Sequence, residues 1–163
     1  MPMTERQLLR LRLRNVMPSF IHRTFQTVAP GAPYHDNWHI AVIARYLEWC
    51  IEGRITRLII TMPPRSLKSI SVSVAFPAYA LGHRPNLNFI CASYSNDLAA
   101  KHSRDCRSVL ESHWYRELEP RTRLARPGSP IAKHARRPWW RGPRRPFLAK
   151  VSTSRTIRMS ESS

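Results

Sequence analysis

The feature that most constrains the fold is an apolar run followed by a proline-rich connection and a second apolar run. Arg57–Thr61 (RLIIT) is rich in β-branched residues, as buried parallel strands are. Met62–Ser69 (MPPRSLKS) follows, and the next apolar stretch reaches Gly82. We expect this stretch to be a helix kinked at Pro77, although its many β-branched residues favour a helix only weakly. A strand, an abrupt loop and a helix in this order predict an α/β unit.

Helical patterns precede this unit. Residues 4–16 and the stretch that Pro18 opens are compatible with two helices. Asp36 is a candidate N-cap for a further helix that runs to Glu52, with Gly53 at its C-terminal end. One face of that helix has the spacing of a buried surface. Its residues are Ile43, Tyr46, Leu47 and Cys50.

A second strand and helix follow the first pair. Asn88–Ala92 (NFICA) has the composition of a buried strand. Ser95 or Asn96 is then placed to cap a helix over DLAAKHSRDCRSVLES. Since strands and helices alternate, we predict a sheet of parallel strands flanked by helices.

Met62–Ser69 contains the groups that a phosphate-binding loop uses. Lys68 offers a charge for the β- and γ-phosphates, and the hydroxyl of Ser69 is placed to hold Mg²⁺. Against the pattern G-x-x-x-x-G-K-[ST], Met62 and Leu67 stand where glycines belong. The alternative is a proline-rich connection with a solvated lysine. The pattern alone leaves both interpretations open.

These segments together resemble the large terminase subunits of tailed phages, whose variant loops commonly carry Pro-Pro-Arg followed by Lys-Ser. The likeness includes WHIAVIARYLEWCIEGRITRLII before the loop and FICASYSNDLAAKHSRDCRSVLES after it. WYRELEP resembles the next landmark of the family, with Glu119 in place of the usual aromatic residue. The likeness covers residues 17–125. It implies a P-loop NTPase-like α/β fold with a parallel sheet, here incomplete, and it argues against an unrelated P-loop enzyme such as a helicase.

The resemblance also implies a site for ATP and Mg²⁺. Ser66 and Lys68 would contact the nucleotide, and Ser69 would coordinate the metal ion through its hydroxyl. Arg65 would be a catalytic arginine that stabilises charge on the transferred phosphoryl group. The alternative for Arg65 is a solvated loop charge.

Trp38 and His39 match a Trp-His pair that, in the family, is thought to lie near the adenine. Packing at a helix start is the alternative, because aromatic residues dominate cores. His35 and His39 are four residues apart but lack a third ligand, so we expect no metal site there. Tyr94 and Ser95 follow the second strand at the end where α/β proteins bind ligands, or they are simple turn residues.

The charge of the chain points to a polyanionic partner. The formal net charge is +17, and residues 126–163 hold 10 Lys and Arg against one Glu. Nucleic acid is the leading candidate for the partner. Residues 126–163 also contain many prolines and show no helical or strand period, so we predict a disordered basic tail. A genuine basic arm that grips nucleic acid is the alternative.

The chain lacks the acidic half of the site that the family requires. After Arg126 the only acidic residue is Glu161, whereas an ATPase of this class needs a carboxylate for Mg²⁺ and another for water. We also expect these residues to include no part of the nuclease domain of the family. One hypothesis is that the tail is translated out of frame, because a shifted reading of Lys150–Ser160 permits an acidic strand end such as G-V-D-L-A-D-D-P-D-V. The gene sequence decides this.

We therefore divide the chain into an N-terminal helical lead-in (1–35), a partial ATPase domain (36–125) and the basic tail (126–163). The expected function is that of a truncated terminase ATPase, so enzymatic activity is uncertain. By resemblance, its partners would be double-stranded phage DNA, the portal and the small terminase subunit. The alternative is a small basic nucleic-acid-binding protein without ATPase activity. Three cysteines, no secretory signal and no membrane-length apolar stretch predict a cytosolic protein. The resemblance to phage terminases implies the cytoplasm of a bacterial host.

Overall fold

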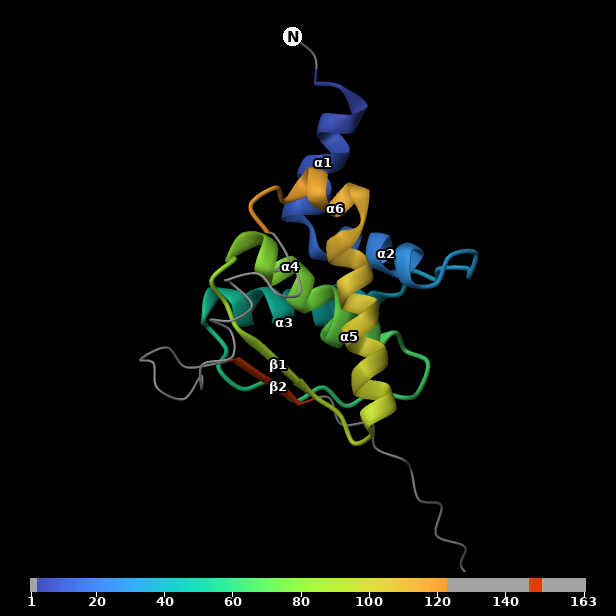
Figure 1. The fold of residues 1–163 in the computed structure, drawn as a ribbon, viewed down its shortest axis with the longest axis vertical. Helices are drawn as coiled ribbons and strands as arrows, with labels where there is room; N and C mark the ends of the chain where they lie inside the picture. Colours follow the sequence, from blue (N-terminus) through green and yellow to red (C-terminus); the bar gives the residue numbers. More distant parts are fainter. Residues whose placement is uncertain (1–2, 123–146, 151–163) are drawn as a thin grey trace, which may run out of the picture.

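The structure is a computed structural model that describes residues 3–122 and 147–150. Figure 1 shows that helices make up most of it, with a short pair of strands at one side. In chain order the elements are α1 (Glu5–Asn15), α2 (Met17–Val28), α3 (Trp38–Glu52), the π-helix η1 (Ile70–Ala75), α4 (Phe76–His83), β1 (Phe89–Ala92), α5 (Asn96–Glu111), α6 (His113–Leu118) and β2 (Phe147–Lys150).

The predicted P-loop-like parallel sheet is wrong. The chain is mostly helical, and Arg57–Thr61 forms no strand. β1 confirms the second predicted strand but not its expected burial, because Cys91 and Ala92 are exposed. Within the described residues it pairs only with β2, in parallel, with Phe89 opposite Phe147. A strand exists only where a neighbour completes its ladder. Within the described residues, no segment offers that ladder to Arg57–Thr61, so an apolar, β-branched composition was not sufficient.

The predicted helices before the loop are confirmed as α1, α2 and α3. The N-cap of α3 is Asn37 rather than Asp36, and Gly53 ends the helix in the left-handed conformation with φ 82°. Of the predicted buried face, Ile43, Leu47 and Cys50 are buried. Tyr46 is 42% exposed, so its assignment to that face was wrong. The helical period was right, but the buried face is rotated away from Tyr46 and includes Ile40 and Ala44.

The predicted helix after the loop forms, and Pro77 is accommodated by a change of helix type. Proline has no N–H, and its ring presses against the carbonyl group four residues earlier, here that of Ser73. The chain widens into η1 just before this point, and the N–H of Phe76 donates to the carbonyl of Ser71, five residues back. A π-turn relieves such crowding, so the helix continues through Pro77 to His83.

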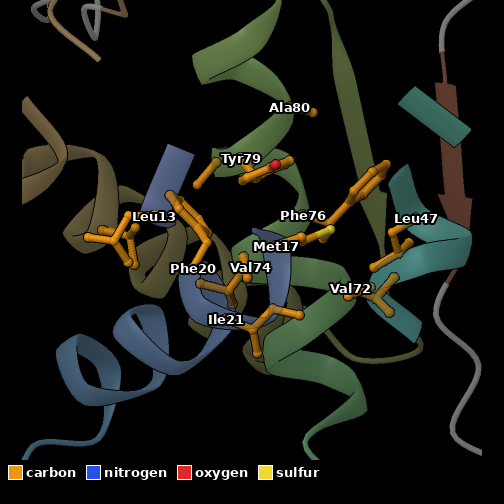
Figure 2. Close-up of a cluster of buried hydrophobic side chains, with 14 of the residues drawn as sticks. Leu13, Met17, Phe20, Ile21, Leu47, Val72, Val74, Phe76, Tyr79 and Ala80 are labelled. Atoms are coloured by element: carbon orange, nitrogen blue, oxygen red, sulfur yellow. The ribbon is translucent and has the colours of Figure 1, made fainter. Parts of the chain in front are cut away.

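η1 and α4 form the centre of the hydrophobic core. Every residue from Ser71 to Ala80 is buried, so this helix is covered on all sides. Side chains from α1, α2 and α3 meet it, as Figure 2 shows for Phe20 beside Tyr79. Their rings lie 5.2 Å apart, edge to face, and Phe20 also meets Trp114 of α6 at 5.4 Å. The β-branched residues that weaken the helical propensity are therefore compensated by burial.

Ion pairs attach α1 to the C-terminal end of this core. Arg10 lies 2.9 Å from the Glu117 carboxylate, and Arg14 lies 3.3 Å from Glu119. Both arginines are more than half exposed, so each pair contributes modestly to stability. Glu119 itself is only 5% exposed, whereas the other three side chains of these two ion pairs are about half exposed.

Most of the tail predicted as disordered (126–163) lies outside the described residues, as do its paired tryptophans and most of the shifted-frame stretch. The exception is Phe147–Lys150, which forms β2. Among the described helices, none is both long and apolar enough to cross a lipid bilayer. The described cysteines Cys50, Cys91 and Cys106 are free thiols.

Candidate phosphate-binding site

Met62–Ser69 forms a tight loop at the N-terminal end of the buried helix. Arg65 and Leu67 adopt the left-handed conformation, with φ of 65° and 58°. They are the only described non-glycine residues with positive φ, so Ser66 and Lys68 have the opposite sign. When left-handed and right-handed backbone conformations alternate, successive N–H groups point toward one concave side of the loop. This geometry binds anions. Leu67 thus adopts a left-handed conformation, which glycine adopts easily, at the position where the phosphate-loop pattern has a glycine.

Lys68 begins the helical run that continues to His83. Only 6% of Lys68 is exposed, which does not fit the alternative of a solvated lysine. A buried ammonium group requires acceptors or a negative charge around it. Its position also coincides with the positive end of the helix dipole, where an anion would be stabilised.

Ser66 connects the loop to α3. Its hydroxyl donates to the carbonyl oxygen of Pro63 at 2.8 Å and closes the loop on itself. The carbonyl oxygen of Ser66 lies 3.2 Å from Nε2 of His39. Because a carbonyl oxygen can only accept, this contact requires the tautomer of His39 protonated at Nε2. The start of α3 and the loop are therefore held together.

Trp38 stands beside His39 at the start of α3, with the two ring centroids 6.2 Å apart. It is 76% exposed, so helix-start packing does not account for its ring. A flat, exposed aromatic surface next to a loop tied down by His39 can stack on a base. The structure thus brings together the two regions that the sequence assigned to adenine and phosphate.

Ser69 lies in the helical run directly after Lys68, whereas Arg65 lies in the loop before it. Ser69 is the second residue of the helical run, in ordinary right-handed geometry, and its side chain is partly exposed. Its hydroxyl can therefore reach a metal ion held by a phosphate. Arg65 is exposed on the loop, where its guanidinium can approach an anion from outside.

Of the remaining candidate residues, Ser95 has a structural role at a helix start. Ser95 caps α5, since its hydroxyl accepts from the N–H of Leu98 at 3.3 Å. Tyr94 is 79% exposed and follows β1. In the part of the chain that the structure describes, no three His, Cys, Asp or Glu side chains gather into a metal site, and His35 belongs to no such group.

Two features of the site were not predicted. The left-handed conformations of Arg65 and Leu67 have no signal in residue type, since such positions favour glycine or asparagine. His39 was assigned to the adenine, but its Nε2 atom contacts the carbonyl oxygen of Ser66 in the loop. Comparisons with protein-family models, curated proteins and solved structures give no match to this chain.

Proposed function

We propose that Met62–Ser69 binds the phosphates of a nucleotide, and that the chain represents part of the ATPase domain of a phage DNA-packaging terminase large subunit. The proposal rests on the loop whose backbone alternates between left-handed and right-handed conformations. This loop leads directly into the helical run, whose first residue is Lys68. Backbone N–H groups, the helix dipole and one lysine are the elements from which phosphate sites are built.

Each side chain has a role in this proposal. Lys68 neutralises the β- and γ-phosphates, and the hydroxyl of Ser69 holds the Mg²⁺ that accompanies them. Arg65 approaches the γ-phosphate from solvent. Trp38 stacks on the adenine, while His39 keeps the start of α3 attached to the loop.

We expect binding without appreciable hydrolysis. Hydrolysis in this class needs a carboxylate that orients the attacking water and another that holds Mg²⁺. After Arg126 the sequence supplies only Glu161. ATP turnover by the purified chain that disappears in Lys68→Ala would contradict this part of the proposal.

Thermal unfolding with and without Mg·ATP tests the site. A ligand at about 100 times its Kd stabilises the folded chain by about 2.7 kcal/mol. We expect Mg·ATP to raise the Tm of the wild-type chain, and Lys68→Ala to abolish the rise. Lys101→Ala is the matched control, because Lys101 lies on α5, where its ammonium group pairs with Asp105 at 2.6 Å.

Ser69→Ala is a second test of the site, in case the Lys68 variant fails to fold. Ser69 is partly exposed, so its loss should leave the fold intact. The variant should retain a response to ATP but lose the additional rise that Mg²⁺ gives. A wild-type chain whose Tm does not respond to nucleotide, or responds equally in Lys68→Ala, overturns the proposal.

The charge of +17 favours a second candidate, a nucleic-acid-binding protein. In that case the affinity for double-stranded DNA would fall steeply with salt, survive Lys68→Ala and disappear when residues 126–163 are deleted. Double-stranded DNA is a partner under both functions. The portal and the small terminase subunit are partners only under the first, and their binding is tested by co-purification with the intact chain.

A further inference from the structure

A side chain from α3 fixes the orientation of the peptide group between Ser66 and Leu67. The carbonyl oxygen of this peptide group, which belongs to Ser66, lies 3.2 Å from Nε2 of His39. The peptide bond is trans, as are all those that the structure describes, so its C=O and N–H bonds point in opposite directions. Because the carbonyl group faces His39, the N–H of Leu67 points away from α3. In a loop of alternating conformation the N–H groups gather on the concave side, where an anion binds.

The next peptide group, between Leu67 and Lys68, is oriented by the helix itself. The carbonyl oxygen of Leu67 accepts from the N–H of Ser71 at 2.9 Å and from the hydroxyl of Ser71 at 3.0 Å. The N–H of Lys68 therefore points out from the helix start. The N–H of Leu67 lies one residue before this helical run, so its orientation depends on the contact with His39 instead.

The opposite orientation of the Ser66–Leu67 peptide group would relieve backbone strain. Leu67 has a φ of 58°, which a leucine disfavours because its Cβ atom crowds the carbonyl oxygen that follows. Half a turn of this peptide plane would bring φ of Leu67 into the negative, extended range. It would also point a carbonyl oxygen, in place of the N–H, into the anion site. The strain of one left-handed residue and the net contribution of one hydrogen bond are similar in size, so the bond from His39 decides between the two orientations.

We propose that His39 is a positioning residue for the phosphates. Its hydrogen bond to Ser66 holds the N–H of Leu67 toward the anion, at the position where the phosphate-loop pattern has a freely rotating glycine. This inference rests on the proposed function, because it concerns the same site. It goes further by assigning His39 to phosphate recognition rather than to the adenine, and by naming the N–H group through which His39 acts.

Titration with magnesium tripolyphosphate tests the proposal, because this ligand has phosphates and no base. His39→Met keeps a side chain of similar length but removes the donor. We expect it to weaken the affinity about three- to tenfold, as for the loss of one hydrogen bond. His39→Gln should bind like the wild type, since its amide group can donate to the same carbonyl oxygen.

Leu67→Gly separates the orientation of the peptide group from a simple attachment of the loop to α3. Glycine adopts the left-handed conformation without strain, so in a His39→Met background Leu67→Gly should restore most of the lost affinity. Leu67→Ala is the matched control, because it also removes the side chain beyond Cβ but keeps the strain. It should restore nothing in that background. If His39 only tied the two segments together, neither substitution would rescue binding.

Nuclear magnetic resonance adds a measurement that needs no variant. In the wild-type chain the amide proton of Leu67 should shift downfield when magnesium tripolyphosphate is added, because it then donates to a charged acceptor. The proposal is overturned by bound tripolyphosphate that leaves this proton unshifted, by His39→Met with unchanged affinity, or by Leu67→Gly that rescues no better than Leu67→Ala. In each of these cases a loss of binding in Lys68→Ala would still support the phosphate site. A wild-type chain that does not bind tripolyphosphate overturns both the positioning role and the proposed function.

Discussion

The backbone of Gly82 lies against the side chain of Glu119, so closely that a Cβ atom added at Gly82 would be 2.8 Å from Cγ of Glu119. Gly82 belongs to α4, and Glu119 is the residue that ends α6. This contact lets the chain after α6 lie directly on the central helix. It also explains how a carboxylate comes to be buried there, beside the Arg14 guanidinium.

We expect Gly82→Ala to destabilise the fold. Glycine to alanine usually stabilises a helix, but here the methyl group would overlap a buried side chain, and overpacking of this kind costs about 1–3 kcal/mol. Urea denaturation measures the loss. The control is the same change in a Glu119→Ala background, which removes Cγ and should reduce the cost. An equal cost in both backgrounds would contradict the contact.

Glu119 should make stability depend on pH in an unusual direction. Burial raises the pKa of its carboxyl group above 4.5, against the opposing charges of Arg14, His83 and Arg121. A raised pKa means that the folded state binds the proton more tightly than the unfolded state. The buried carboxylate therefore costs stability above its folded pKa, and this cost disappears as the pH falls toward 4.5.

Glu119→Gln isolates that contribution, because glutamine keeps the shape and cannot ionise. We expect the variant to be more stable than the wild type at pH 7, with the difference shrinking as the pH approaches 4.5. Denaturant unfolding at several pH values gives the comparison. A variant less stable than the wild type at pH 7, with a deficit that closes at low pH, would show that the Arg14 ion pair outweighs burial.

A buried hydrogen bond of Tyr115 attaches α6 to the central helix. Its hydroxyl donates to the carbonyl oxygen of Ala78 at 2.7 Å, and none of the side chain is exposed. Tyr115→Phe should lower the free energy of unfolding by about 1 kcal/mol, as for one buried hydrogen bond. Tyr46→Phe is the control, because Tyr46 is 42% exposed and should lose almost nothing.

The sequence predicted the helices better than the sheet for a physical reason. Helix hydrogen bonds are local, so the period of α3 and the cap at Ser95 sufficed. A strand depends on partners distant in sequence, and Arg57–Thr61 has none among the described residues. Its side chains alternate between buried and exposed as in a strand, but this alternation does not provide a second segment to pair with.

The candidate site was predicted in part. The order of loop, Lys68 and Ser69 followed from the sequence, and the structure places them at a helix start. The left-handed backbone of Leu67 did not follow, because leucine disfavours that conformation by about 1–2 kcal/mol. Partial burial of the Leu67 side chain against the core compensates for part of that cost. Such compensation depends on tertiary packing, which residue type alone does not reveal.

Trp38 offers a test that separates recognition of the base from recognition of the phosphates. Base stacking on an aromatic side chain is worth about 1–3 kcal/mol, so Trp38→Ala should weaken ATP binding about tenfold or more. Because the side chain is 76% exposed, the fold should keep its stability within about 0.5 kcal/mol. Calorimetric titration with Mg·ATP and with magnesium tripolyphosphate measures both affinities.

The two ligands should respond differently to the same substitution. Tripolyphosphate has no base, so its affinity should be unchanged in Trp38→Ala and lost in Lys68→Ala. Tyr46→Ala, an exposed aromatic residue farther along α3, should change neither affinity. If Trp38→Ala weakens both ligands equally, Trp38 acts by holding the loop through its neighbour His39. In that case the exposed ring is no platform for adenine, although the phosphate site itself would stand.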